Sequence, residues 1–261
     1  MEEIKIVTFT FESKCTMKRA LLLIIIASSS GLFAQNNFDK QLPKKKKYTE
    51  DVVDSVYGIT MYEKLNLVLS GDSVRKENGY AVENWVEDFY ENGQLLHKGY
   101  YIEGQLKVYK NYYPDGTLER TFNNVDGYRS KLTLYYPSGK IKSKVEYMQK
   151  DAKIWTDYYD NGNIEYYEEY HKSLLYHIAK RSYFKDGSPM SLMEMTHKKK
   201  LEYSQNDFHD NGNKKMAGKL RFDKDVYDYY RYGKWLYFDK SGAPTKDEEY
   251  SNGKIVKTKK Y

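Results

Sequence analysis

"NYYPDGTLER" (111–120) is the stretch that decides the fold, because nearly the same phrase returns as "TLYYPSGKIK" (133–142) and "TDYYDNGNIE" (156–165). Each copy has two adjacent tyrosines, a short polar turn that ends in glycine, and a hydrophobic residue soon after it. A motif that recurs at a fixed interval of this length is typical of repeat proteins. The sequence therefore predicts a tandem array of small, similar units.

Seven turn glycines align the units across residues 85–261: Gly93, Gly116, Gly139, Gly162, Gly187, Gly212 and Gly242. The residue before each glycine is Asn, Asp or Ser, all of which favour turns. The residue four positions before each glycine is aromatic in all seven units. Each unit therefore reads as strand, tight turn, strand and looser turn, which predicts a meander of β-hairpins.

The turn residues also predict the type of hairpin loop. Pro114 and Pro137 stand two positions before a glycine, where the fixed φ of proline suits the first central position of a type I turn. The glycine would then adopt positive φ and close a three-residue loop with a bulge. We expect this conformation at Gly139 in particular, where a β-branched residue would be strained.

The paired aromatic residues define both surfaces of the predicted sheet. Adjacent residues on a strand point to opposite faces, so each pair places one ring above the sheet and one below it. Cross-strand aromatic pairs stabilise a sheet by roughly 0.2–1 kcal/mol each. With no helical segment evident to cover either face, we expect an all-β fold. It would be an elongated single-layer antiparallel meander of about seven tandem β-hairpin repeats, twisted or curled.

Composition agrees with a thin, half-solvated architecture. The chain has 261 residues, of which 29 are tyrosine, and tyrosine packs with its ring while its hydroxyl stays near water. The net charge of +6 arises from 43 basic and 37 acidic residues. So mixed a surface argues against nucleic acid as a partner, because that function needs a concentrated basic stripe.

The N-terminal residues predict export. "MKRALLLIIIASSSGLFA" (17–34) has a charged start, a short apolar run and a small-residue end, as a secretory signal peptide does. We expect 1–34 to be an upstream read-through plus this signal, 35–56 a polar lysine-rich linker, 57–84 a degenerate capping β unit, and 85–261 the repeats. The single cysteine, Cys15, precedes the signal, so the mature chain would have no thiol chemistry. The destination would be the periplasm, the outer surface or the medium.

No pattern in the sequence indicates catalysis, a cofactor or a metal site. The five histidines have no metal-ligand spacing and are expected to be surface strand residues: His97, His171, His177, His197 and His209. There is no glycine-rich phosphate loop and no nucleophile elbow. We therefore predict no catalytic, cofactor-binding or metal-binding residues and a non-enzymatic protein.

The repeats resemble the MORN-repeat variant family. Its members carry a Tyr-Tyr-x-Asn-Gly turn and often Gly-Lys-Trp at the opening of the next unit. Here "YYPDG" (112–116), "YYPSG" (135–139), "YYDNG" (158–162) and "YGKWLYFDKSG" (232–242) match that pattern. The fifth and sixth units depart from it in "YFKDGSPM" and "FHDNGNKK". The resemblance implies a non-enzymatic role in scaffolding, at membranes or as an antitoxin-like protein.

The leading hypothesis is an exported scaffold that binds another protein. The paired aromatic residues form a row of rings, or aromatic ladder, on each face of the sheet. These ladders either only hold the sheet together, or one of them is partly exposed and docks the partner. The expected interaction anchors are the three tryptophans and the second tyrosines of three units: Trp85, Trp155, Trp235, Tyr113, Tyr136 and Tyr159. Two alternatives stay open: a cell-envelope glycan or choline-type binder, and a protein that binds anionic membrane surfaces through Lys44–Lys47 and His197–Lys200.

Overall fold

A computed structural model of the chain describes residues 47–49, 53–54, 59–60, 74–124, 126, 128–149 and 151–261. The predicted signal peptide lies outside these residues, and the predicted linker and capping unit lie only partly within them. All of the described residues belong to one compact unit, Lys46–Tyr261, and the sheet and both of its faces lie within that unit.

Strands that follow one another closely make up almost all of the described repeat region. The long ones are β6 (Asn84–Tyr90), β7 (Leu95–Ile102), β8 (Gln105–Tyr112), β9 (Leu118–Asn124), β10 (Arg129–Tyr135), β11 (Ile141–Met148), β12 (Asp151–Tyr158), β13 (Ile164–Tyr170), β14 (His177–Tyr183), β15 (Pro189–His197), β16 (Glu202–Phe208), β17 (Lys214–Asp223), β18 (Asp228–Phe238), β19 (Pro244–Ser251) and β20 (Lys254–Lys260). Five two-residue strands precede them: β1 (Lys47–Tyr48), β2 (Val53–Asp54), β3 (Ile59–Thr60), β4 (Lys76–Glu77) and β5 (Tyr80–Ala81).

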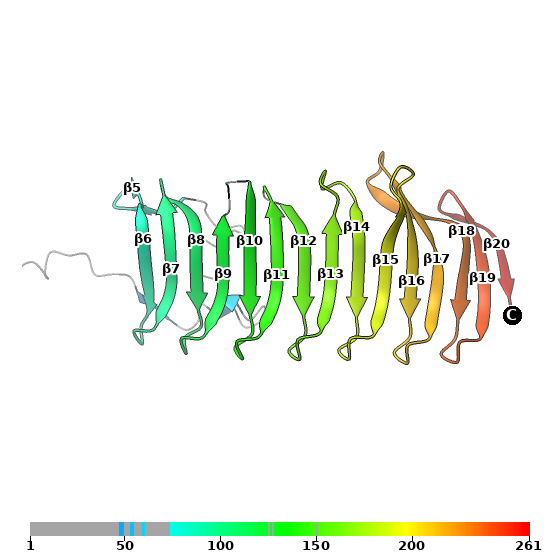
Figure 1. Ribbon diagram of the computed structural model, residues 1–261, viewed down its shortest axis with the longest axis horizontal. Coiled ribbons are helices and arrows are strands. Elements are labelled where there is room, and N and C mark those ends of the chain that lie inside the picture. The colour runs from blue at the N-terminus through cyan, green and yellow to red at the C-terminus, as the bar shows by residue number, and fades with distance from the viewer. Residues whose placement is uncertain are drawn as a thin grey trace, which may run out of the picture. The chain divides into compact units, whose positions relative to one another are not determined.

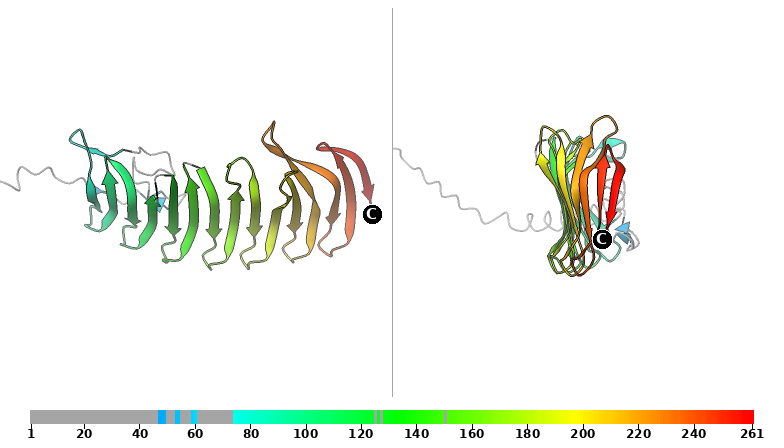
Figure 2. Two further views of the ribbon diagram at one scale, coloured as in Figure 1. Left: turned by 45° about the horizontal axis from the view of Figure 1, so that its top comes forward. Right: turned by 90° about the vertical axis from the view of Figure 1, so that its right-hand side faces the viewer.

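The long strands form one sheet in which each strand pairs with its neighbours in sequence. Every pairing from β6 to β20 is antiparallel, and β1 adds a short parallel pairing to β6. Figure 1 shows the strands side by side in chain order, joined by short turns along both long edges. The strands rotate gradually along the array, as the end-on view in Figure 2 shows. The prediction of a twisted single-layer meander of hairpins is confirmed.

The tight turns have the predicted three-residue geometry. In the turn of the third unit, the amide of Gly139 donates to the carbonyl of Tyr136 at 2.8 Å, and the amide of Tyr136 donates to the carbonyl of Lys140 at 2.8 Å. Gly139 has φ of 78°, and all seven turn glycines fall between 78° and 94°. Across the same turn the strand register shifts by one residue, which is the expected bulge.

The two faces of the sheet differ in what they bury. We call face A the face that carries Tyr109, Phe122, Leu132 and Val145, which are cross-strand neighbours in register on β8 to β11. These four side chains are between 1% and 6% exposed and belong to the first hydrophobic core cluster. Face B carries the opposite residues of the same strands. It holds several cross-strand ion pairs, such as Lys131 with Glu146 at 2.8 Å.

A second core cluster lies on face A near the other end of the sheet. It consists of Tyr176, Met193, Leu201, Tyr203 and Phe222, with Met195, Leu220 and Tyr229 packed against it. The long β17–β18 hairpin brings the last of these into place, since its tip leans toward β15 and β16 in Figure 1. There the hydroxyl of Tyr229 accepts a hydrogen bond of 2.9 Å from the amide of His177 on β14. Face A therefore has two buried clusters. The face is more open between them and along the strand ends that lead into the tight turns.

Candidate binding surface

In the first four units, the second aromatic residue of the motif links its unit to the next one. Its hydroxyl donates a hydrogen bond to the backbone carbonyl of the first aromatic residue in the following unit. The bonds run from Tyr90 to Tyr112 at 2.7 Å, Tyr113 to Tyr135 at 3.1 Å, Tyr136 to Tyr158 at 2.7 Å, and Tyr159 to Tyr183 at 2.8 Å. Each bond satisfies a backbone carbonyl at the end of a strand, next to the tight turn. The bond also fixes the direction in which the ring lies across face A.

The motif rings of successive units do not form the direct cross-strand aromatic pairs that the sequence analysis considers. Equivalent residues of successive units are two strands apart, about 9.6 Å at the usual strand spacing. Aromatic pairs interact at centroid separations of about 4.5–7 Å, so the motif rings are too far apart to stack on each other. A tyrosine can still reach the next unit with its hydroxyl. The ladder is therefore made of hydroxyl–carbonyl bonds.

The chemistry of the ladder changes in the fifth unit. Phe184 occupies the position of the second tyrosine and has no hydroxyl to donate. His209 follows in the sixth unit, where its Nε2 lies 3.0 Å from the carbonyl oxygen of Phe238. The two irregular units seen in the sequence therefore differ in this bond. The fifth unit lacks the hydroxyl that would make it, and in the sixth unit an imidazole takes the place of the hydroxyl.

Exposure of this ring position changes along the sheet. Tyr90 is 0% exposed and Tyr113 is 6% exposed, so the first two rings belong to the interior. The next four are half-buried and lie on face A by strand alternation: Tyr136, Tyr159, Phe184 and His209. We call these four rings the open row. Because three of them are tied to a backbone carbonyl, their orientations are fixed before any partner arrives.

The bulge residues lie on the strands that follow those leading to the rings of the open row. They are the residues skipped by the strand register after each turn: Lys142, Glu165, Met190 and Lys215. The ammonium of Lys142 lies 5.9 Å from the centre of the Tyr136 ring. Glu165 is exposed and close to two rings, since its charge adds to burial in raising the pKa of both Tyr136 and Tyr159. Raised pKa values keep these hydroxyls protonated, so they serve as donors and not as nucleophiles.

A second line of aromatic and acidic side chains lies beside the open row on face A. The indole Nε1 of Trp155 donates to Asp157 at 2.7 Å, and the hydroxyl of Tyr166 donates to Glu168 at 2.6 Å. The ammonium of Lys180 lies 6.0 Å from the Tyr166 ring. Lys180 is exposed and the other four side chains are half-buried. Aromatic rings that are partly open to solvent are enriched at interaction surfaces, and the carboxylates beside them would belong to a polar rim.

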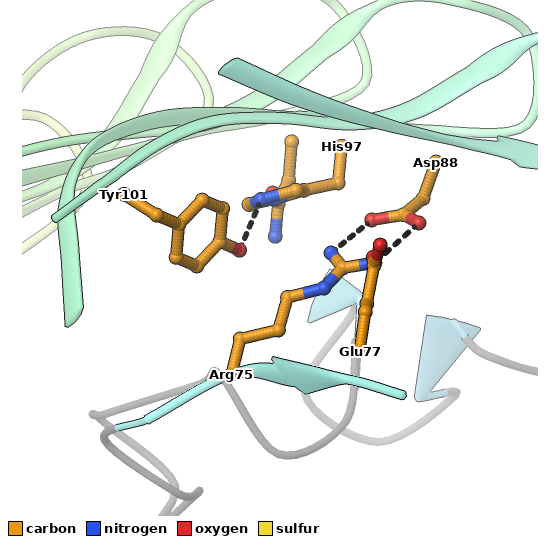
Figure 3. A network of polar contacts seen from close by, with 6 residues as sticks. Arg75, Glu77, Asp88, His97 and Tyr101 are labelled. Atoms are coloured by element: carbon orange, nitrogen blue, oxygen red, sulfur yellow. Dashed lines mark hydrogen bonds and ion pairs between the residues drawn. The ribbon is translucent and has the colours of Figure 1, made fainter. Parts of the chain in front are cut away.

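A buried polar cluster at the N-terminal end of the sheet brings several titratable groups together (Figure 3). Arg75 lies in the segment Val74–Glu83, which we call the strap, and donates to both oxygens of Asp88 on β6 at 2.6 and 2.9 Å. On β7, His97 bonds Asn111 at 2.6 Å through Nδ1 and the hydroxyl of Tyr101 at 2.9 Å through Nε2. These bonds tie the strap and three strands together.

The cluster is built for stability and offers no reaction centre. His97 is 0% exposed, and its burial lowers the pKa of the imidazole from 6.5 to about 4, so it is neutral at physiological pH. Burial also raises the pKa of Tyr101. A neutral imidazole with both nitrogens engaged has no free lone pair for a substrate. The prediction of surface histidines is wrong for His97, because its ring fills the space above Gly99, where a Cβ would lie 2.4 Å from Nε2.

The structure separates the six predicted anchors into three groups. Trp155, Tyr136 and Tyr159 come together on face A in and beside the open row. Trp85 is 56% exposed but lies on face B, where its ring is 5.3 Å from Tyr100 and 5.7 Å from the ammonium of Lys98. The other two are interior residues: Tyr113 is 6% exposed and Trp235 is 1% exposed.

Glycines within strands are the sequence signal that could have predicted the burial of Trp235 and of His97. Trp235 lies flat on Gly218, where a Cβ would meet the indole at 2.1 Å, just as His97 lies on Gly99. A glycine inside a strand often marks the close approach of another group. By contrast, nothing in the sequence pattern places the tip of the β17–β18 hairpin near His177, because that contact joins residues 52 positions apart.

Two further features bear on the class of site. Across the described ranges, no group of three or more His, Cys, Asp or Glu side chains is arranged to hold a metal ion. Within the same residues, no helix is long and apolar enough to cross a membrane.

Comparison with known families identifies the repeats. The family described as MORN repeat variant matches residues 86–103 and 131–149, which contain β6–β7 and β10–β11 with their turns. Two stretches of the chain therefore match MORN-variant repeats, and the resemblance seen in the sequence is confirmed at these repeats. Repeats of this family are non-enzymatic modules that bind proteins or membranes. No curated protein matches the chain.

Proposed function

We propose that the protein is an exported, non-enzymatic scaffold that binds a partner protein through the open row and the side chains beside it. The observation that carries this proposal is the change in exposure at one motif position. Tyr90 and Tyr113 are buried, whereas the equivalent rings from Tyr136 to His209 are half-open yet held by inter-unit hydrogen bonds. Rings that are rigid before binding lose little conformational entropy when a partner docks.

Face B is a weaker candidate for the same role. Its charged residues pair with one another across strands, for instance Arg181 with Glu194 at 2.6 Å and Lys234 with Asp247 at 2.6 Å. A surface whose charges are already paired gains less from a charged partner. Trp85 is an exposed tryptophan on this face, but it lies at the far end of the sheet from these pairs. Face B therefore does not place an exposed aromatic anchor next to these charged groups.

Affinity capture with matched variants tests this proposal. Tyr159→Ala with Phe184→Ala removes two rings of the open row, while Tyr158→Ala with Tyr183→Ala removes the adjacent rings on face B. We expect a partner retained by the wild type and by the face B variant to be lost from the open-row variant. Retention by both variants, or loss from both with the fold intact, would reject face A as the binding surface.

Export is tested independently of the binding surface. The signal-like stretch at 17–34 motivates it, and cleavage would leave Gln35 as the first residue. N-terminal sequencing of the protein from envelope and culture fractions should begin at Gln35 or within a few residues of it. An intact Met1 or Met17 in a cytosolic fraction would reject export and leave the binding proposal unaffected.

A further inference from the structure

The open row also carries information on the shape of the partner. Its rings recur once per unit, so they are separated by two strand spacings, about 9.6 Å. An extended polyproline II segment has three residues per turn and rises about 3.1 Å per residue, which gives about 9.3 Å per turn. Every third residue of such a segment therefore advances by almost the distance between neighbouring rings.

From this match, and building on the proposed function, we infer that the open row binds a proline-rich polyproline II segment with proline at every third position. Each proline would pack on one fixed ring, Tyr136, Tyr159, Phe184 or His209. Aromatic-lined grooves bind such segments because the ligand is already extended and loses little entropy. Four rings span three intervals, about 29 Å, which corresponds to roughly nine or ten residues of ligand.

The side chains around the centre of the row indicate where the ligand carries charge. Glu165 lies on β13, between the strands that lead to Tyr159 and Phe184, and within the described residues its carboxylate has no ion pair with a basic group. Lys215 lies on β17, beyond the last ring of the row, His209. A basic residue at the middle of the segment would complement Glu165, and one at the His209 end would be repelled by Lys215. We therefore assign the ligand a central lysine or arginine.

The hydrogen bonds of the row explain why it suits this ligand. The hydroxyls of Tyr136 and Tyr159 are directed into the next unit, so the rings present flat surfaces and not polar tips. A polyproline II helix has no internal hydrogen bonds and keeps its carbonyls solvated. Its proline rings can therefore cover the aromatic rings while its carbonyls stay in water.

Calorimetric titration of the full chain tests the inference. The probe is a synthetic twelve-residue peptide with proline at every third position and one central lysine. A peptide of the same composition with irregular proline spacing is the control. We expect the regular peptide to bind about tenfold more tightly than the irregular one, since losing one well-packed contact costs about 1.4 kcal/mol or more. Equal affinities, or no binding of the regular peptide at millimolar concentration, would overturn the inference.

Variants localise the contact. Tyr159→Ala should weaken the regular peptide about tenfold, whereas Tyr158→Ala, one residue away on face B, should change affinity by less than about threefold. Glu165→Gln should weaken it several-fold at low salt and have little effect at high salt, because screening removes the charge term. Equal losses for Tyr158→Ala and Tyr159→Ala would reject the site, with circular dichroism confirming that both variants fold.

The experiment also separates this inference from the proposal on which it rests. Loss of the captured partner from the open-row variant, together with failure of the peptide, would keep face A as a protein-binding surface and reject the polyproline ligand. A linear oligosaccharide is the third probe. Its binding, sensitive to Tyr159→Ala in the absence of peptide binding, would replace the protein ligand with a glycan.

Discussion

Two neighbouring parts of face A carry the same motif but differ in burial: β8 to β11, which hold the first core cluster and which we call the buried half, and β12 to β14, which precede the second cluster and which we call the open half. At the same register, β8 to β11 place Tyr109, Phe122, Leu132 and Val145, whereas β13 and β14 place Glu168 and Lys180. The first four are 1–6% exposed, and the last two are half-buried and exposed. The turn and the aromatic pair are shared by both halves, so they determine strand pairing. The residues between the motifs determine whether the face becomes a core or a surface.

The largest expected effect comes from truncating a ring or chain in the buried half. Leu132→Ala should lower the free energy of unfolding by about 2–5 kcal/mol, because a side chain that is 1% exposed leaves a cavity. Lys180→Ala changes the same register position in the open half and should stay within about 0.5 kcal/mol. Urea denaturation of both variants measures the difference. Similar losses in the two halves would erase the distinction between them.

Acid should weaken the buried half through His97. Its pKa is lowered from 6.5 to about 4 by burial, so the unfolded chain binds a proton more readily than the folded chain. The contribution of the neutral His97 ring to the free energy of unfolding is fully present above pH 6.5 and is lost as the pH falls to about 4. The total loss is about 3 kcal/mol at 1.36 kcal/mol per pKa unit. Stability measured against pH should therefore fall less steeply over this range in His97→Gln. An unchanged slope would mean that His97 is not buried as a neutral ring.

The turn glycine should matter through its backbone and not through its surroundings. A Cβ at Gly139 would meet nothing within 4 Å, yet φ is 78°. Gly139→Val should cost about 1–2 kcal/mol from the left-handed conformation alone. Gly139→Asn, which tolerates that region, should cost less. Hydrogen exchange around residues 130–147 reports the effect, and full protection in the valine variant would contradict the hairpin turn.

The smallest expected effect is a gain. Phe184→Tyr restores a hydroxyl at the interrupted position of the ladder, opposite the carbonyl of Phe208. The new bond should raise stability by about 0.5–1.5 kcal/mol. Phe208→Tyr, the other aromatic position of the next motif, is the matched control and should change little. A stabilisation no larger than that of the control would show that the hydroxyl–carbonyl bond does not join the units.

The fold could be predicted from the sequence because its turns and strands depend on residues close together in the chain. Asp-Gly and Asn-Gly turns, proline at the first turn position and adjacent aromatics each specify backbone conformation within a few residues, and Gly139 shows the expected φ. The positions of the predicted anchors could be read from the sequence only in part. Trp155, Tyr136 and Tyr159 were predicted as anchors and come together on face A, while Tyr113 and Trp235 have the same residue types but are buried.

The missing information is long-range. The Arg75–Asp88 ion pair depends on how the strap crosses the sheet, and the His177–Tyr229 bond depends on how the β17–β18 hairpin bends. Periodicity predicts neither of them. The hydroxyl–carbonyl ladder was missed for a different reason: tyrosine repeats suggest stacking, and only the two-strand separation between units shows that rings cannot meet.

Hydroxyl-radical footprinting with mass spectrometry tests the central claim most directly, because it compares the same motif position in both halves of one molecule. The account predicts strong modification of Tyr159 and Phe184 in the free protein and protection of Tyr90 and Tyr113. Addition of the partner should then protect the first two and leave the others unchanged. Equal modification of Tyr113 and Tyr159 in the free protein would contradict the division of face A into a buried half and an open binding half.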